Sequence, residues 1–180
     1  MEKFQCSEEI LGTSNLSVNV SAESKKTGKQ SQEKALYPFE VMYEGLERSW
    51  VSLEDKKPLG VIFENHLVTF RVSPTRMNWH EAMAYCQSIK IGGNACSAGK
   101  IKFWEKLVWN EKEELFDDLY KQLSAESLKD KVFWSSSECD SSNNLAWMWM
   151  YVHDDWGYGD KDFTFGLYVC PVLDLSKLSL

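Results

Sequence analysis

A group of four aspartates near the C-terminal end is the densest set of side chains in the sequence that could do chemistry. The group surrounds two glycines, which would permit tight turns. Clustered carboxylates can hold calcium, although this spacing departs from the ligand order of an EF-hand loop. We expect a solvated acidic loop without a cofactor, and keep calcium as the alternative. The aspartates are Asp154, Asp155, Asp160 and Asp162, and the glycines are Gly157 and Gly159.

The histidines and cysteines form no recognisable catalytic pattern. His66, His80 and His153 fall in three different parts of the sequence. The chain contains no Gly-x-Ser-x-Gly elbow, Gly-x-Gly-x-x-Gly loop or His-Glu-x-x-His helix. We therefore predict that the protein is not an enzyme. No Cys-x-x-Cys pair occurs, which predicts free thiols, with one disulfide as the alternative, for Cys6, Cys86, Cys96, Cys139 and Cys170.

The charge and apolar content exclude two classes of partner. The chain of 180 residues has a formal net charge of -7, which argues against nucleic-acid binding. No apolar run approaches the roughly 20 residues that a membrane helix needs. The first residues also lack the apolar stretch of ~7–15 residues found in a signal peptide. We expect a virion or cytoplasmic protein that contacts neither nucleic acid nor membrane; the alternative is a cell-surface or extracellular protein.

A change of composition near residue 35 divides the chain into an arm and a domain. Residues 1–35 contain no Trp or Tyr and are rich in Ser, so they cannot bury enough apolar surface to fold alone. Within them, residues 16–20 alternate like a short strand. We predict an extended N-terminal arm over 1–35, which attaches to a partner or to copies of the chain, and a domain over 36–180. The alternative is a tail without a role.

The elements that must position the acidic segment are helices and strands of a mixed α+β domain. Residues 59–63 and 66–72 read as a hairpin, and residues 51–53 as a short strand. One helix should start after Asn78, because Glu81 completes a capping box, and end near residue 91. A second should start at Asn110, with Asp117 among its solvent-facing residues. The remaining segments are predicted as strands at 132–135, 146–152 and 163–172, separated by loops at 136–144 and 153–162.

Five motifs in this order resemble the C-type-lectin-like domains of bacteria and phages. The family is represented by the Fibrobacter major paralogous domain and the Legionella collagen-like protein C-terminal domain. The resemblance implies a fold with two helices, a small mixed or antiparallel sheet and long C-terminal loops. The chain departs from the family where its closing Arg is Cys170, and it lacks the calcium motifs of animal lectins. The five motifs are residues 77–86, 109–115 and 133–137, the pair Ala146-Trp147 and residues 168–172; residues 59–63 also resemble a hairpin that often precedes the domain.

The same family includes proteins that diversity-generating retroelements mutate in a C-terminal segment. Residues 143–167 resemble such a segment, because varied residues alternate with scaffold-like ones. In the strand predicted at 146–152, Trp147, Trp149 and Tyr151 would point into the core, which leaves Met148 and Met150 outward. Exposed Met and aromatic residues beside polar ones are typical of adaptable contact surfaces. The alternative is that all the rings are core and that the Met face packs on the arm or on a second subunit.

These observations predict a non-enzymatic, adhesin-type domain that displays a hypervariable binding surface. We expect a phage virion or tail component that binds protein or glycan on a host or partner cell. The alternatives are a bacterial surface or secreted binding protein and a purely structural virion subunit. The predicted ligand-binding residues are Met148, Met150, His153, Asp154, Asp155, Trp156, Tyr158, Asp160, Asp162, Phe163 and Phe165.

Overall fold

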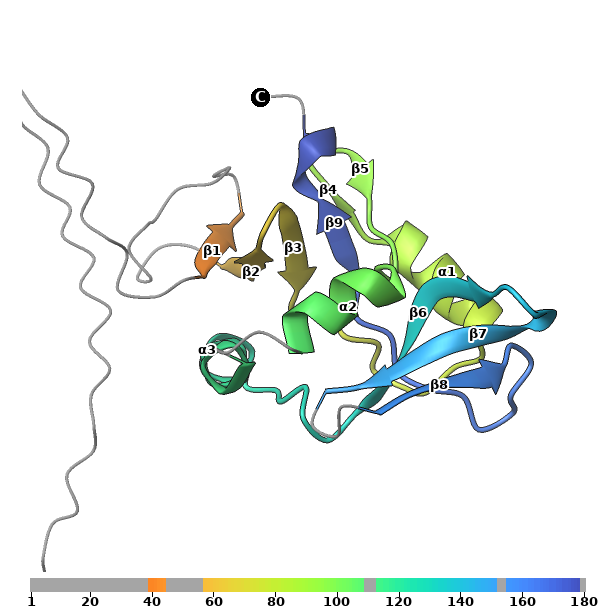
Figure 1. Cartoon of the computed structure of the whole chain (residues 1–180). Helices are drawn as coiled ribbons and strands as arrows, with labels where there is room; N and C mark the ends of the chain where they lie inside the picture. Colours follow the sequence, from red (N-terminus) through yellow and green to blue (C-terminus); the bar gives the residue numbers. More distant parts are fainter. Residues whose placement is uncertain (1–38, 45–56, 109–112, 152–154, 179–180) are drawn as a thin grey trace, which may run out of the picture.

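The described residues fold into two larger antiparallel sheets and a small two-stranded one, with helices between and beside the larger sheets (Figure 1). The computed structural model describes residues 39–44, 57–108, 113–151 and 155–178. The predicted arm over 1–35 and the strands predicted at 16–20 and 51–53 lie outside this part. The mixed α+β class is confirmed. No helix in the described ranges is long and apolar enough to cross a membrane.

The first sheet has the strand order β1-β2-β3-β9. Its strands are β1 (Glu40–Tyr43), β2 (Pro58–Phe63), β3 (His66–Thr69) and β9 (Val172–Asp174). The predicted hairpin is confirmed as β2 and β3, and Glu64 makes its turn with a φ of 51°. A two-stranded hairpin of β4 (Lys90–Ile91) and β5 (Asn94–Ala95) lies near β9 (Figure 1). Because it contains both β1 and β9, the first sheet joins the beginning and the end of the described domain.

Two of the three described helices follow the sequence prediction. In α1 (Trp79–Ser88), Asn78 and Glu81 form the predicted capping box, and Cys86 is buried. The second predicted helix is α3 (Glu113–Ser124), preceded by residues outside the described part. Asp117 does not face water as predicted: it is buried and accepts hydrogen bonds from the Ser127 hydroxyl and the Leu128 amide. Because these groups of the following turn donate to the Asp117 carboxylate, its side chain can be buried and need not face solvent.

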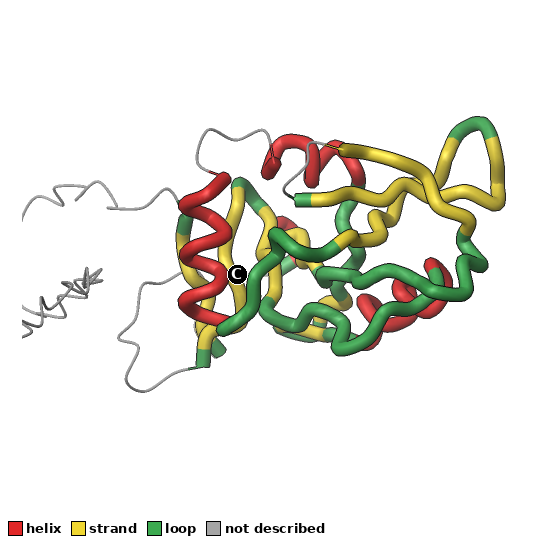
Figure 2. The backbone as a smooth tube through the Cα atoms, turned by 90° about the horizontal axis from the view of Figure 1, so that it is seen from below, coloured by secondary structure: helices red, strands yellow, loops and turns green. Residues whose placement is uncertain are grey.

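The helix α2 (Ile101–Val108) is missing from the sequence prediction. It lies between the two sheets (Figures 1 and 2). No Asn, Asp, Ser or Thr precedes it as a local cap, since Gly99 and Lys100 occupy those positions. Instead, the hydroxyl of Ser137 accepts a hydrogen bond from the Ile101 amide at 3.0 Å. A cap supplied from a distant strand leaves no local signal in the sequence.

The second sheet has the strand order β6-β7-β8 and contains most of the predicted binding segment, residues 143–167. Its strands are β6 (Val132–Cys139), β7 (Ser142–Met150) and β8 (Asp155–Asp160). The predicted loop at 136–144 is wrong, because β6 and β7 extend toward a tight turn. The predicted loop at 153–162 is also wrong, since β8 occupies most of it. The predicted strand at 163–172 is replaced by turns, isolated bridges at Leu167 and Tyr168, and the start of β9.

Stacked aromatic rings join α2 to the second sheet. Trp149 lies between Trp104 and Phe133, with ring centroids 4.1 Å and 4.5 Å away. All three rings are fully buried. Burial of each such ring contributes on the order of 2–3 kcal/mol, so this stack is a main reason why the sheet has a fixed position.

Candidate functional site

The strand β8 holds the acidic segment in a regular ladder against β7. Six consecutive residue pairs join Leu145–Met150 to Asp155–Asp160. A Cβ added to Gly159 would lie 2.6 Å from the buried Trp134 ring, and one added to Gly157 would lie 2.9 Å from the Met148 methyl group. The two glycines therefore let other side chains cover the strand, and do not form the tight turns that the sequence suggested.

A buried lysine secures the end of β8. The ammonium group of Lys161 donates to the Glu138 carboxylate and to the Asn143 carbonyl, both at 2.6 Å. It also lies 4.6 Å from the centre of the Trp79 ring. Only 8% of the Lys161 side chain is exposed. The sequence analysis missed this residue, because a lysine among aspartates normally reads as a solvated charge.

The chain after β8 is a loop with backbone hydrogen bonds at both ends. The Asp162 amide donates to the Asp160 carboxylate at 2.9 Å, and the Phe163 amide donates to the Asp160 carbonyl at 3.0 Å. At the far end, Leu167 and Met77 exchange two backbone hydrogen bonds of 2.9 Å. Gly166 has a φ of 57° and no room for a Cβ beside the Met77 backbone. The loop therefore presents its side chains from a fixed frame.

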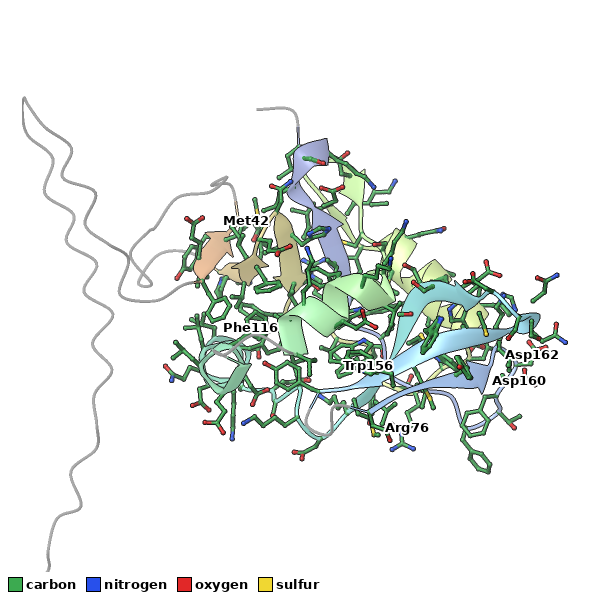
Figure 3. The ribbon with its side chains drawn as sticks, in the orientation of Figure 1. Met42, Arg76, Phe116, Trp156, Asp160 and Asp162 are labelled. Atoms are coloured by element: carbon green, nitrogen blue, oxygen red, sulfur yellow. The ribbon has the colours of Figure 1, made fainter. Side chains whose placement is uncertain are left out.

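The exposed large apolar side chains gather on this segment. In the described part of the chain they are Tyr158, Phe163 and Phe165, which are 52%, 43% and 76% exposed. Phe163 and Phe165 contact each other with centroids 5.8 Å apart, and Tyr158 contacts Trp147 at 4.5 Å. Figure 3 shows that Asp160 and Asp162 lie at the end of the second sheet farthest from Met42. Exposed rings beside exposed carboxylates are a physical basis for a contact surface.

The predicted site residues divide into an exposed set and a packed set. The exposed set contains Asp155, Tyr158, Asp160, Asp162, Phe163 and Phe165. His153 and Asp154 lie outside the described residues. The structure thus keeps six of the predicted positions available to a partner.

The packed set corrects the expected exposure of three residues. Met148 is half-buried against the cluster that joins α1 to Trp134, so it does not point freely outward. Trp156 is half-buried against the main core, and Figure 3 places it near α2. Met150 is half-buried as well. Helices cover both faces of the sheet near its centre, which explains why apolar residues alternate on both faces.

The expected inward set is confirmed for Trp149 and Tyr151, which are fully buried. Trp147 is only half-buried and contacts Tyr158 at the border of the core. One face of the sheet therefore changes from core to exposed surface along its length. This border forms the inner limit of the candidate site.

The aspartates that the structure describes do not meet at one point. Asp155 and Asp160 lie at opposite ends of the six-residue strand β8, which places them about 16 Å apart at ~3.3 Å per residue. Within the described ranges, no group of three acidic, His or Cys side chains could hold a metal ion. The loop that the calcium alternative assumed is therefore not the structure of this segment.

The other polar groups considered for chemistry lie in separate places. His66, on β3, contacts the ring of Phe103 on α2. His80 is exposed, and its Nε2 lies 3.9 Å from the Asp162 carboxylate. The described cysteines, Cys86, Cys96, Cys139 and Cys170, are free thiols, as predicted; Cys6 lies outside the described part.

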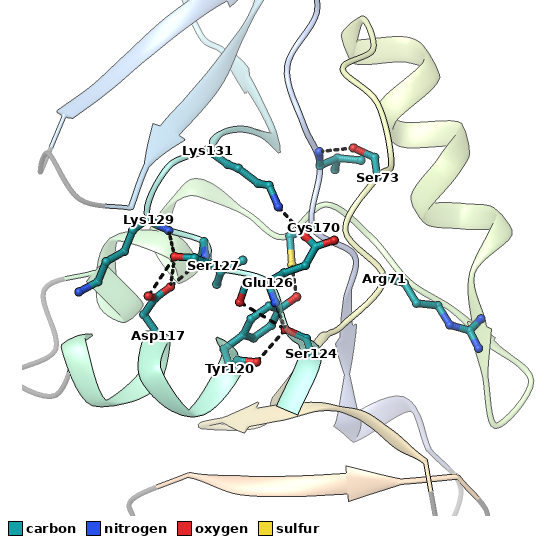
Figure 4. Close-up of polar contacts among 12 residues, drawn as sticks. Arg71, Ser73, Asp117, Tyr120, Ser124, Glu126, Ser127, Lys129, Lys131 and Cys170 are labelled. Carbon is teal, nitrogen blue, oxygen red and sulfur yellow. Dashed lines mark hydrogen bonds and ion pairs between the residues drawn. The ribbon is translucent and has the colours of Figure 1, made fainter. Parts of the chain in front are cut away.

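The interior polar network around α3 satisfies buried groups (Figure 4). The Tyr120 hydroxyl donates to the Thr69 carbonyl at 2.6 Å and lies 3.9 Å from the Cys170 sulfur. Burial raises the pKa of Cys170 to about 12 and raises the pKa of Tyr120 well above its ordinary value. Both groups are therefore neutral at ordinary pH, which suits a structural role.

Neither the models of known protein families nor the curated protein sequences match this chain. The C-type-lectin-like fold therefore stays a prediction from the motifs. The α+β class and the antiparallel sheets are compatible with it.

Proposed function

We propose that this chain is a non-enzymatic binding domain of the C-type-lectin-like type, and that residues 155–165 form its ligand-binding face. One observation carries the proposal: the exposed large apolar side chains of the described residues are confined to Tyr158, Phe163 and Phe165. Exposed rings lose hydration when a partner covers them, and such aromatic anchors often contribute about 2 kcal/mol or more to binding.

The frame beneath these rings supports this proposal. The six-pair ladder, buried Lys161 and the bonded ends of the loop hold the rings in place before a ligand arrives. Such preorganisation reduces the entropy lost on association. Rigid aromatic area surrounded by polar residues is also the composition of antibody paratopes.

The alternation of fixed and exposed positions supports a hypervariable surface. Trp149, Lys161 and Gly166 are buried, whereas Tyr158 and Phe165 are exposed in the same segment. Exchange of the exposed residues would alter the ligand without disturbing the frame. In this proposal the domain is a phage virion or tail component that binds protein or glycan on a host or partner cell, and the arm over 1–35 attaches it to other subunits.

The experiment compares binding by the wild type, by a Phe163→Ser/Phe165→Ser variant and by a Gln87→Ala control. Gln87 is exposed on α1 and belongs to no described aromatic contact. The probes are a glycan array and a panel of intact bacterial cells. We expect the wild type and the control to bind the same probe, and the Phe variant to lose at least tenfold in affinity. Equal binding by all three proteins would reject the proposed face.

A further inference from the structure

The backbone of β8 offers a second mode of contact, because this strand is at an edge of its sheet. The order β6-β7-β8 leaves one side of β8 without a partner strand among the described residues. The Lys161 amide donates to the Asn144 carbonyl, so the alternation of an antiparallel ladder directs the Tyr158 amide and carbonyl away from β7. These groups can pair with an added strand.

Apart from the Asp160 carbonyl, which accepts from the Phe163 amide, this edge lacks the usual protection against such pairing. Natural edge strands are commonly blocked by Lys, Pro, bulges or a very short length. Between Asp155 and Asp160 the sequence contains no Lys, Arg or Pro, and the ladder with β7 keeps a regular register. The nearest lysine, Lys161, is turned inward to Glu138 and Asn143.

The charge at this edge selects the partner. Asp155, Asp160 and Asp162 are all exposed. A second copy of this chain, with a net charge of -7 and the same exposed carboxylates, would be repelled from this edge. A strand with cationic residues at the corresponding positions would be attracted instead.

We propose that the outer edge of β8 binds an extended peptide segment of a partner protein by strand addition, and that Lys or Arg side chains of this segment face Asp155 and Asp160. Main-chain hydrogen bonds to Tyr158 supply affinity, and the two carboxylates set the register, as in other cases of strand addition. The inference rests on the proposed function in that it assigns a class of partner to the same face. It depends on the backbone edge, however, and not on the two Phe rings.

The test uses two blocked hexapeptides, Lys-Thr-Val-Thr-Val-Lys and the matched Glu-Thr-Val-Thr-Val-Glu. Titration into ¹⁵N-labelled full chain at low salt, followed by NMR, reports the amide shift of Tyr158. We expect the cationic peptide to bind at least about tenfold more tightly, and this preference to shrink at 1 M salt, where the screening length is about 3 Å. Equal affinities, or shifts that leave Tyr158 unaffected, would overturn the proposal.

Two substitutions at one position separate the backbone from the ring. Tyr158→Ala removes the ring and keeps the amide, so the cationic peptide should still bind within about threefold. Tyr158→Pro removes the outward amide and should abolish the shifts of neighbouring residues. Should Tyr158→Pro fail to fold, a peptide N-methylated on its pairing edge serves instead and should not bind the wild type. Binding of that N-methylated peptide as tight as that of its parent would contradict strand addition.

The outcome is distinguishable from failure of the proposed function. The Phe163→Ser/Phe165→Ser variant keeps the β8 edge and should bind the cationic peptide like the wild type. Loss of peptide binding in this variant would mean that the rings, and not the edge, hold the peptide, and would refute the inference while leaving the ring-based site intact.

Discussion

The two glycines of β8 give a matched pair of substitutions that tests the structure of this segment. In Gly159→Ala, the new methyl group would lie 2.6 Å from one carbon of the Trp134 ring and 3.0 Å from a second. Trp134 is fully buried, and its indole nitrogen donates to the Met77 carbonyl at 2.9 Å. The ring cannot retreat without losing this bond and disturbing its neighbours.

In Gly157→Ala, the new methyl group meets the terminal methyl of Met148 at 2.9 Å and little else. Met148 is half-buried, and its flexible side chain can rotate away. Overpacking of a rigid core typically costs ~1–3 kcal/mol, whereas a Gly→Ala change without strain stabilises by about 0.4–1 kcal/mol through the unfolded chain. We expect Gly159→Ala to lower the free energy of unfolding by about 1–2 kcal/mol and Gly157→Ala to change it by less than about 0.5 kcal/mol.

Thermal unfolding followed by circular dichroism measures the difference. At about 2–4 °C per kcal/mol for a chain of this size, Gly159→Ala should melt roughly 2–8 °C below the wild type, and Gly157→Ala within about 2 °C of it. If 153–162 were instead a solvated loop, both substitutions would be neutral. Equal melting temperatures for the two variants would therefore refute the packing of β8 on Trp134.

Three further predictions concern buried or bonded polar groups. Lys161→Met should destabilise the protein by about 1–3 kcal/mol in urea unfolding, because the Asn143 carbonyl loses its donor. The Glu138 side chain is 56% exposed and can be hydrated again, so a loss above about 4 kcal/mol, as for a fully buried ion pair, would contradict this account. In a Cys6→Ser background, a thiol reagent at pH 8 should modify Cys139 first, because hydrogen bonds from Ser141 lower the pKa of that thiol. Burial raises the pKa of Cys96 to about 11 and that of Cys170 to about 12. Faster modification of Cys170 than of Cys139 would show that the core is open to the reagent. Hydrogen bonds from the Ser176 hydroxyl and amide lower the pKa of Asp174. The contribution of Asp174 to stability is therefore present above about pH 4 and is lost as the pH falls through the lowered pKa. The difference in melting temperature between wild type and Asp174→Asn should shrink between pH 5 and pH 2, and a constant difference would exclude this linkage.

The parts of the fold predicted from sequence are those with local signals. The capping box at Asn78 and Glu81 and the apolar strands on either side of Glu64 depend on residues near one another in the chain. Alternation over residues 146–152 also predicted the inward direction of Trp149 and Tyr151 correctly. Such local patterns need no knowledge of the rest of the molecule.

The parts that could not be predicted depend on distant residues. Glycines weaken an isolated strand, so β8 is apparent only once Trp134 and Met148 cover Gly159 and Gly157. The cap of α2 comes from Ser137, which is 36 positions away. The sequence alone predicted which segment holds the candidate site. It could not show that Trp156 is packed and Tyr158 exposed, because this depends on what covers each face of the sheet.

The central claim is that residues 143–167 combine a replaceable face with a fixed frame, and saturation mutagenesis of this segment tests it most directly. Surface-displayed variants would be sorted for resistance to protease, which reports folding without knowledge of the ligand. We predict that most substitutions at Asp155, Tyr158, Asp160, Asp162, Phe163 and Phe165 leave the domain folded, since surface changes usually alter stability by no more than about 0.5 kcal/mol. Few substitutions should be tolerated at Ala146, Trp149, Lys161 and Gly166, which are buried. If Phe163 and Phe165 prove as intolerant as Trp149, these rings belong to the frame and the proposed binding face does not exist.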